Sequence, residues 1–332
     1  MNRRTRRTLL VVAAVLVILA LAIFLRSKAP PEAARLLPES EGILYFNLRP
    51  VHSFLHKDMK PPTRVTEYQQ FVDATGIDWE RDLNQAAVAL HRMDNPDGPN
   101  GPVAYSMVLV GKITGPKLHN WLEAHAASRE TYAGHTIYSI PVEERTVRVS
   151  QVGYDTVAVS NYPTSEKIHS ILDRHVTAAW PFAGSSLLEA HYRDVPLLAL
   201  AWGVGQLGMP FNESGAISIF GFQLPLESDA TIIASVSPEL PLAGALRIRV
   251  EEIAASNDAA ARQTAQLQAL VLLARGFTSP LSDTTANRGL KQLLKTTEIS
   301  QNRSRVVVKG DLPTSFLAGL AHPSTSPEGA SK

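Results

Sequence analysis

The chain has 332 residues, of which 45% are hydrophobic and 19% charged, a composition typical of a folded protein and too apolar for disorder. It contains no cysteine, which excludes disulfides, thiolate metal sites, cysteine nucleophiles and a lipidated cysteine anchor. The first 28 residues hold six basic side chains and no acid, so the remaining 304 carry 26 basic and 31 acidic side chains and have no general attraction for nucleic acid.

The N-terminus carries the strongest signal in the sequence. Residues 9–25 are 17 consecutive apolar residues, from Leu9 to Leu25, with four arginines before them and two basic residues after them. As a helix they span about 26 Å, which with snorkelling arginines is enough to cross a lipid bilayer. The positive-inside rule predicts that residues 1–28 are a cytoplasmic tip and single-pass signal anchor in the inner membrane, with an extracytoplasmic body. A cleavable signal peptide, indicated by Ala20-Leu21-Ala22, and a twin-arginine export signal are alternatives.

Residues 29–36 are rich in proline and alanine and are predicted to be a short linker that keeps the body close to the membrane. Residues 37–180 are predicted to form a first α+β half. Hydrophobic periodicity predicts helices over 63–76, 115–128 and 164–176. Alternating and β-rich segments predict strands over 41–50, 85–93, 103–113, 135–141, 145–152 and 155–161.

Residues 181–321 are predicted to form a second α+β half. It begins with a helix whose capping box is Ser186 and Glu189. Strands are predicted over 195–204, 216–227, 230–237 and 244–253, a long helix over 256–275, a short helix over 288–295 and a hairpin over 298–313. Residues 322–332 are predicted to be a disordered tail.

The order of elements repeats along the chain at a spacing of roughly 130 residues, which indicates an internal duplication. Residues 103–113 and the helix after them would correspond to 244–253 and the long helix that follows. Clean alternation of inward and outward residues favours a mainly antiparallel sheet with helices on one face. The predicted fold class is therefore α+β behind an N-terminal transmembrane helix.

Three segments behind the anchor carry a resemblance to a known family: "LLPESEGILYFNLRP", "YAGHTIY" and "VGYDTVAVSN". In this order the chain resembles an uncharacterised family of bacterial single-pass membrane-anchored envelope proteins, known as a domain of unknown function. The resemblance implies an anchored, repeated α+β body. It implies no activity and no catalytic residues.

A glycine motif raises the question of a dinucleotide cofactor. Gly203, Gly205 and Gly208 match G-x-G-x-x-G after an apolar run, but Met209-Pro210 follow at once and leave no room for the helix that would meet the pyrophosphate. His52 and His56 could share a helical face as metal ligands, but prolines restrict their segment to barely two turns. We therefore expect no cofactor and no metal.

Large apolar side chains on two predicted loops are the candidate contact residues. Trp180 and Phe182 lie between the halves, and Met209 and Phe211 follow the glycine motif. Such side chains can anchor a partner or a ligand, or can plug the space between the halves. Since the nucleophile-elbow, zincin and phosphate-loop motifs are absent, the sequence predicts a non-catalytic binding or assembly module for another envelope protein or an apolar ligand. The alternative is an anchored envelope hydrolase whose site is assembled from distant segments.

Overall fold

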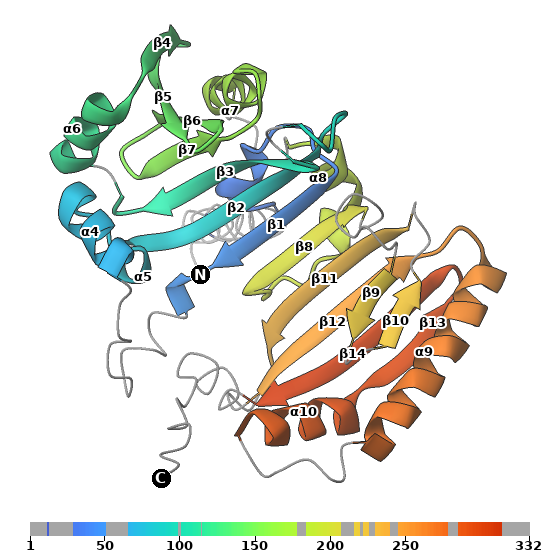
Figure 1. The fold of residues 1–332 in the computed structure, drawn as a ribbon. Coiled ribbons are helices and arrows are strands. Elements are labelled where there is room, and N and C mark those ends of the chain that lie inside the picture. The colour runs from blue at the N-terminus through green and yellow to red at the C-terminus, as the bar shows by residue number, and fades with distance from the viewer. Residues whose placement is uncertain are drawn as a thin grey trace, which may run out of the picture.

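In the computed structural model the body is built on one 12-stranded antiparallel sheet (Figure 1). The structure describes residues 12, 29–50, 66–98, 101–113, 115–177, 184–206, 216–219, 222–225, 230–239, 245–277 and 285–313. Within these residues no helix is long and apolar enough to span a membrane. Of the predicted anchor, only Val12 belongs to the described part, where it is helical and half exposed.

The strand order across the sheet is β13-β14-β12-β11-β8-β1-β2-β3-β7-β6-β5-β4, and β9 and β10 form a separate two-stranded sheet. Strands from the first half of the chain are β1 (Gly42–Asn47), β2 (Leu83–Arg92), β3 (Val103–Gly111), β4 (Ser128–Tyr132), β5 (His135–Val142), β6 (Arg145–Gln151) and β7 (Thr156–Ser160). Those from the second half are β8 (Ala201–Gln206), β9 (Ala216–Ile219), β10 (Phe222–Pro225), β11 (Thr231–Pro238), β12 (Ala245–Ile253), β13 (Glu298–Asn302) and β14 (Arg305–Pro313). These elements confirm the α+β class with a large antiparallel sheet.

The two halves of the sheet have matching strand orders on either side of the β1–β8 pair. Outward from β1 the order is β2, β3, β7, β6, and outward from β8 it is β11, β12, β14, β13. Strands β3 and β12, which the sequence pairs as equivalents, hold the same place in the two halves. The first half differs by the added β4–β5 hairpin, which extends its edge.

Two glycines of the G-x-G-x-x-G motif lie at this central pair of strands. A Cβ atom on Gly205 would lie 2.7 Å from Gly42 Cα and 2.8 Å from Glu41 O, and one on Gly203 would lie 2.7 Å from Leu44 Cδ2. The pair is antiparallel, with Leu44 opposite Gly203. The glycines therefore allow close approach of β1 to β8, which accounts for them without a phosphate ligand. Gly208 lies outside the described residues.

One face of the sheet, here called the α2 face, is covered at its centre by three helices. These are α2 (Glu32–Arg35), α7 (Glu166–Thr177) and α8 (Ser186–His191). The strand residues Ile43, Tyr45, Ala87, Val108, Trp202 and Val204 form one buried cluster with these helices. Since side chains alternate along a strand, the residues between them point to the opposite face.

The prediction that 29–36 is a linker is wrong. Ala33 and Ala34 are fully buried, and Leu36 and Leu37 are buried with them in the same cluster as α7 and α8. Small and aliphatic side chains in this segment fit under the sheet. The proline- and alanine-rich composition therefore reflects close packing of a short helix.

On the opposite face, the helices that the structure describes lie toward its two ends. In the first half these are α4 (Thr66–Thr75), α5 (Trp79–Asp82) and α6 (Pro116–His125), packed by Phe71, Trp79 and Leu122 over β5, β6 and β7. In the second half α9 (Asn257–Phe277) lies on β13 and β14, and α10 (Thr285–Thr296) lies on β14 (Figure 1). The prediction that helices cover one face is therefore wrong, because strand residues of both parities meet helices.

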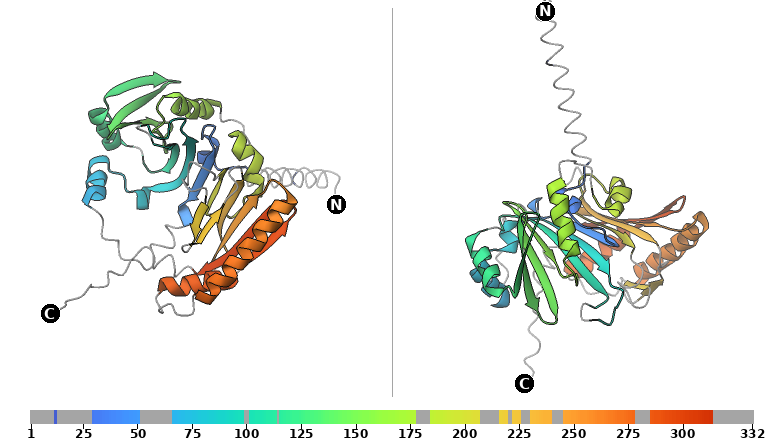
Figure 2. Two further views of the ribbon diagram at one scale, coloured as in Figure 1. Left: turned by 45° about the vertical axis from the view of Figure 1, so that its right-hand side comes forward. Right: turned by 90° about the horizontal axis from the view of Figure 1, so that it is seen from above.

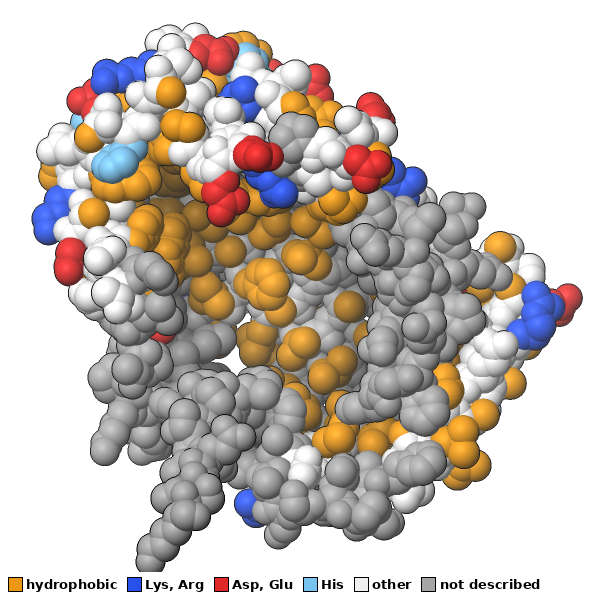
Figure 3. Space-filling model, in the orientation of Figure 1, with side chains coloured by type: hydrophobic (Ala, Val, Ile, Leu, Met, Phe, Trp, Pro, Cys, Tyr) orange, Lys and Arg blue, Asp and Glu red, His pale blue; other side chains and the backbone are white. Residues whose placement is uncertain are grey.

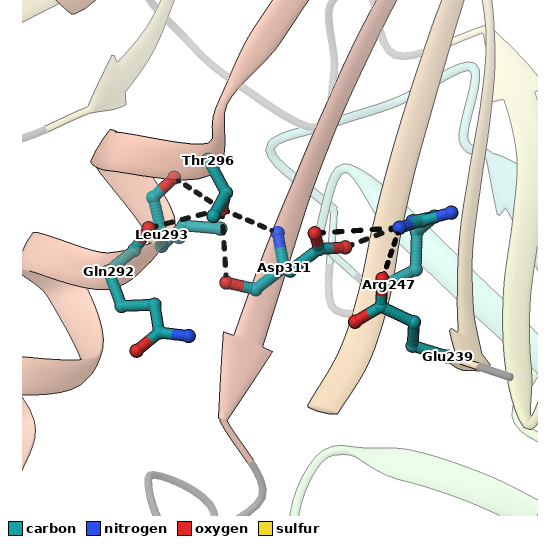
Figure 4. Close-up of polar contacts among 6 residues, drawn as sticks. All are labelled: Glu239, Arg247, Gln292, Leu293, Thr296 and Asp311. Atoms are coloured by element: carbon teal, nitrogen blue, oxygen red, sulfur yellow. Dashed lines mark hydrogen bonds and ion pairs between the residues drawn. The ribbon is translucent and has the colours of Figure 1, made fainter. Parts of the chain in front are cut away.

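Polar contacts fasten α10 to the sheet (Figure 4). The hydroxyl of Thr296 accepts from the backbone N–H of Asp311 at 2.9 Å, and its proton can go to the carbonyl of Gln292, 3.1 Å away. The carboxylate of Asp311 accepts from Arg247 Nε at 2.9 Å, and Arg247 Nη2 lies 2.6 Å from Glu239 Oε1. These hydrogen bonds link α10 to β14 and β14 to β12, and they hold α10 against the sheet.

Three local predictions need correction. The cap of α8 is Ser185, whose hydroxyl accepts from Leu188 N–H, and Ser186 is engaged elsewhere. Residues 128–132 form strand β4, whose polar sequence gives no apolar alternation. The segment 195–204 is strand only from Ala201 onward.

We predict that Gly205→Ala destabilises the protein by about 2 kcal/mol, because its Cβ would overlap the backbone of β1, which cannot yield as a side chain could. Denaturant unfolding of the full chain measures this. The control is Gly276→Ala in α9, where a Cβ meets nothing within 4 Å. Replacing this helical glycine should raise the free energy of unfolding by up to about 1 kcal/mol. Equal stabilities of the two variants would contradict the close-approach role.

Candidate functional site

The central part of the face opposite α2 is apolar and is not covered by any described helix. We call it the open face. It consists of side chains from β1, β2, β3, β8, β11 and β12, which by the strand register point away from α2. Its members are Leu44, Phe46, Ala86, Val88, Leu90, Tyr105, Met107, Ala201, Gly203, Ile232, Ala234, Val236, Ile248 and Val250.

Figure 3 shows this surface as a hollow lined by hydrophobic side chains between the two helical ends of the molecule. Leu44 and Phe46 at its centre are 37% and 40% exposed, and most of the others are half-buried. Charged side chains on the same face of these strands occur only at strand ends, as Arg92 and Glu252. Contiguous exposed apolar surfaces of this kind are often the binding sites of ligands or partners.

The glycines of β8 shape this surface. Because Gly203 has no side chain, Leu44 lies across β8 where a Cβ would meet it at 2.7 Å. Ala201, on the same strand, and Ala234, opposite Gly203 on β11, also have small side chains on this face. The surface therefore combines small residues of β8 and β11 with the longer side chains of Leu44 and Phe46 from β1.

The four contact residues predicted from the sequence, Trp180, Phe182, Met209 and Phe211, lie outside the described residues, as do His52 and His56. Their roles stay predictions. The open face was missed by sequence reasoning, although one signal was available. In β1, both parities of "ILYF" are apolar, so one parity had to lie on the second face of the sheet.

A serine–histidine pair bears on the hydrolase alternative. His91 Nε2 lies 2.9 Å from Ser106 Oγ, which lies 2.9 Å from Ser160 Oγ. Both serines are fully buried and His91 is 2% exposed, so a substrate cannot reach the hydroxyl. Burial, with the positive charge of Lys167 second, lowers the pKa of His91 to about 4, while the backbone of Glu39 opposes the shift. The neutral imidazole therefore serves packing and hydrogen bonding between β2, β3 and β7.

A second hollow, of about 380 Å³, lies beside the β5–β6 hairpin and α6. His119, His135, Tyr138, Gln151 and Tyr154 are among its lining residues, and no carboxylate is. The hydroxyl of Tyr138 lies 3.3 Å from His119 Nδ1. In the described part of the chain no group of three or more His, Asp or Glu side chains could hold a metal ion. The nearby carboxylate of Glu123, which is not among the lining residues, lies 3.6 Å (Oε1) from His119 Nε2 on the same helix.

Comparison with known proteins does not identify the chain. No family model and no curated protein matches it. Crystal form III of TP0453 aligns over 88% of this chain and 98% of its own, with a TM-score of 0.45 and 10% identity. Forms I and IV of TP0453 align with TM-scores of 0.43 at 11% and 12% identity, over 88% and 89% of this chain and 97% and 98% of theirs. Likeness at this level assigns neither family nor function, and the resemblance to anchored envelope proteins stays a prediction.

We predict that the protein loses stability as the pH falls from about 6.5 toward about 4, by up to about 3 kcal/mol from His91. The sign follows because the unfolded imidazole binds a proton near pH 6.5 and the buried one does not until about pH 4. Unfolding free energies across this range measure the slope. His91→Gln should flatten it, and His125→Gln, which removes an exposed imidazole, should not; an unchanged slope in His91→Gln would refute this assignment.

Proposed function

We propose that the protein is a non-catalytic module of the cell envelope that binds an apolar molecule on its open face. In this proposal residues 9–25 anchor it in the cytoplasmic membrane, with the N-terminus in the cytoplasm and the body outside. The open face is the observation that carries the proposal. Leu44 and Phe46 remain exposed at the centre of an apolar surface. Covering them with an apolar group is favourable because it removes apolar area from water.

The chemistry of the open face favours an alkyl chain as the occupant. The surface offers aliphatic side chains with Phe46 and Tyr105, and few polar groups to orient a polar ligand. A lipid-like molecule with an extended hydrocarbon chain matches the apolar character of this surface. The predicted bilayer anchor places the module where such molecules are abundant.

Another envelope protein is the alternative occupant. The candidate residues Trp180, Phe182, Met209 and Phe211 belong to this proposal as contacts with either occupant. The hydrolase alternative is less favoured, since the Ser106–His91 pair is sealed and no carboxylate is among the lining residues of the hollow beside β5–β6.

We further infer that the two halves arose by internal duplication. The matching strand orders on either side of the β1–β8 pair support this inference. A duplicated unit joined edge to edge gives a long sheet whose helices lie far apart on one face. That arrangement leaves the middle of this face without a described helix over it.

The test is native mass spectrometry of the full-length protein released from its own membranes in mild detergent. We expect extra mass of roughly a few hundred daltons, as for one lipid-like ligand. Phe46→Asp should lose it, because a carboxylate placed against an alkyl chain costs at least about 1.4 kcal/mol, or tenfold in affinity.

Val176→Asp is the matched control, since Val176 is 65% exposed on α7, on the other side of the sheet. It should keep the ligand. Bare protein in every preparation would overturn the proposal. A bound polypeptide that Phe46→Asp releases would replace the lipid-like ligand by a protein partner.

A further inference from the structure

The segment between the predicted anchor and the sheet belongs to the core of the body. Ala33, Ala34 and Leu37 have no exposed surface and pack in one cluster with Ile168 and Ile171 of α7. A freely swinging tether would leave these side chains in water. The body therefore has no free joint after residue 32.

Polar contacts of Glu39 fix the same segment to both neighbouring helices. Its carboxylate accepts from Arg174 Nη2 of α7 at 2.8 Å and from the backbone N–H and hydroxyl of Ser186 of α8 at 3.0 and 2.7 Å. Lys167 Nζ also donates to the carbonyl of Glu39 at 3.3 Å. Partial burial alone would raise the pKa of Glu39, but the hydrogen bonds from Ser186 and Arg174 lower it, so the carboxylate stays charged at neutral pH.

The length of chain before α2 limits how far the body can lie from the bilayer. From Leu25, where the apolar run ends, to Ala33 the chain advances by eight residue steps, which span at most about 28 Å when fully extended. If the helix of the anchor continues to Lys28, the free length is shorter still. Since α2 lies on the same face as α7 and α8, the chain must leave the membrane on that side.

We propose that the α7–α8 side of the body faces the anchoring bilayer and that the open face is turned away from it. Figure 2 shows α7 and α8 on the upper side of the strands in its right-hand view, with α9 below. This inference rests on the membrane anchor of the proposed function and not on its ligand. In this orientation the sheet lies between the open face and the anchoring membrane.

The absence of cysteine allows a direct test by single labels. Ala190 on α8 and Ala265 on α9 are exposed and lie on opposite sides of the sheet. Each is replaced by cysteine in a separate variant, Ala190→Cys or Ala265→Cys. Each full-length variant carries a fluorescent label and is reconstituted in phosphatidylcholine vesicles with a nitroxide on the lipid headgroup. We expect quenching at 190 to be at least about twice that at 265. The two labels lie on opposite sides of a body whose radius of gyration is about 19 Å, so they differ in distance from the lipid headgroups.

A matched variant frees the orientation without touching the body. A flexible Gly/Ser insert of about 20 residues between Lys28 and Ala29 adds a mean reach of about 25 Å and should remove most of the difference between 190 and 265. Equal quenching at both positions with the native tether, or stronger quenching at 265, overturns the orientation while leaving the anchor intact. Protein that fails to float with the vesicles overturns the anchor and the orientation together, whereas the ligand is tested separately by its mass.

Discussion

The close pairing of β1 with β8 is the constraint on which the rest of the structure depends. Gly205 lies against the backbone of Glu41 and Gly42, and Gly203 leaves room for Leu44. Without this contact the chain would form two smaller sheets, each with an unpaired edge at its inner end. With it, one sheet extends across both halves, and the centre of the sheet lies far from the helices α6, α9 and α10 that cover its ends. The open face is the direct geometric result.

The two faces of the central strands differ in burial, because α2, α7 and α8 pack on one of them. Ile43, Tyr45 and Trp202 are sealed by α2, α7 and α8, which include the segment that follows the predicted anchor. Leu44 and Phe46, one residue along in the same strand, remain exposed. A single strand thus contributes to a buried face that holds the segment after the predicted anchor and to an exposed apolar face on the other side. Glu39 strengthens the buried side by contacting both α7 and α8.

Much of the secondary structure could be predicted from the sequence, because helices α6 and α7 and strands β2, β3, β11 and β12 have strong 3.6- or 2-residue periodicity. Strand β4 could not, since "SRETY" at a sheet edge carries no apolar alternation. The linker prediction failed at Ala33 and Ala34 because proline- and alanine-rich segments are typical of linkers. Their burial depends on contacts with α7 and α8, which are far away in the sequence. The role of Gly203 and Gly205 in the close approach of β1 to β8 could not be predicted, because it depends on a partner strand far away in the sequence.

The sequence by itself determined the α+β class, most of the order of elements and the absence of cysteine chemistry, and it predicts the apolar anchor. These follow from local composition and periodicity, which act within one element at a time. Only the tertiary structure decided that the halves join at β1 and β8, that α2 is buried, that Ser106 and His91 are sealed, and that Leu44 and Phe46 stay open. Each of these depends on contacts between residues far apart in the chain, for which a single sequence has no periodic signal.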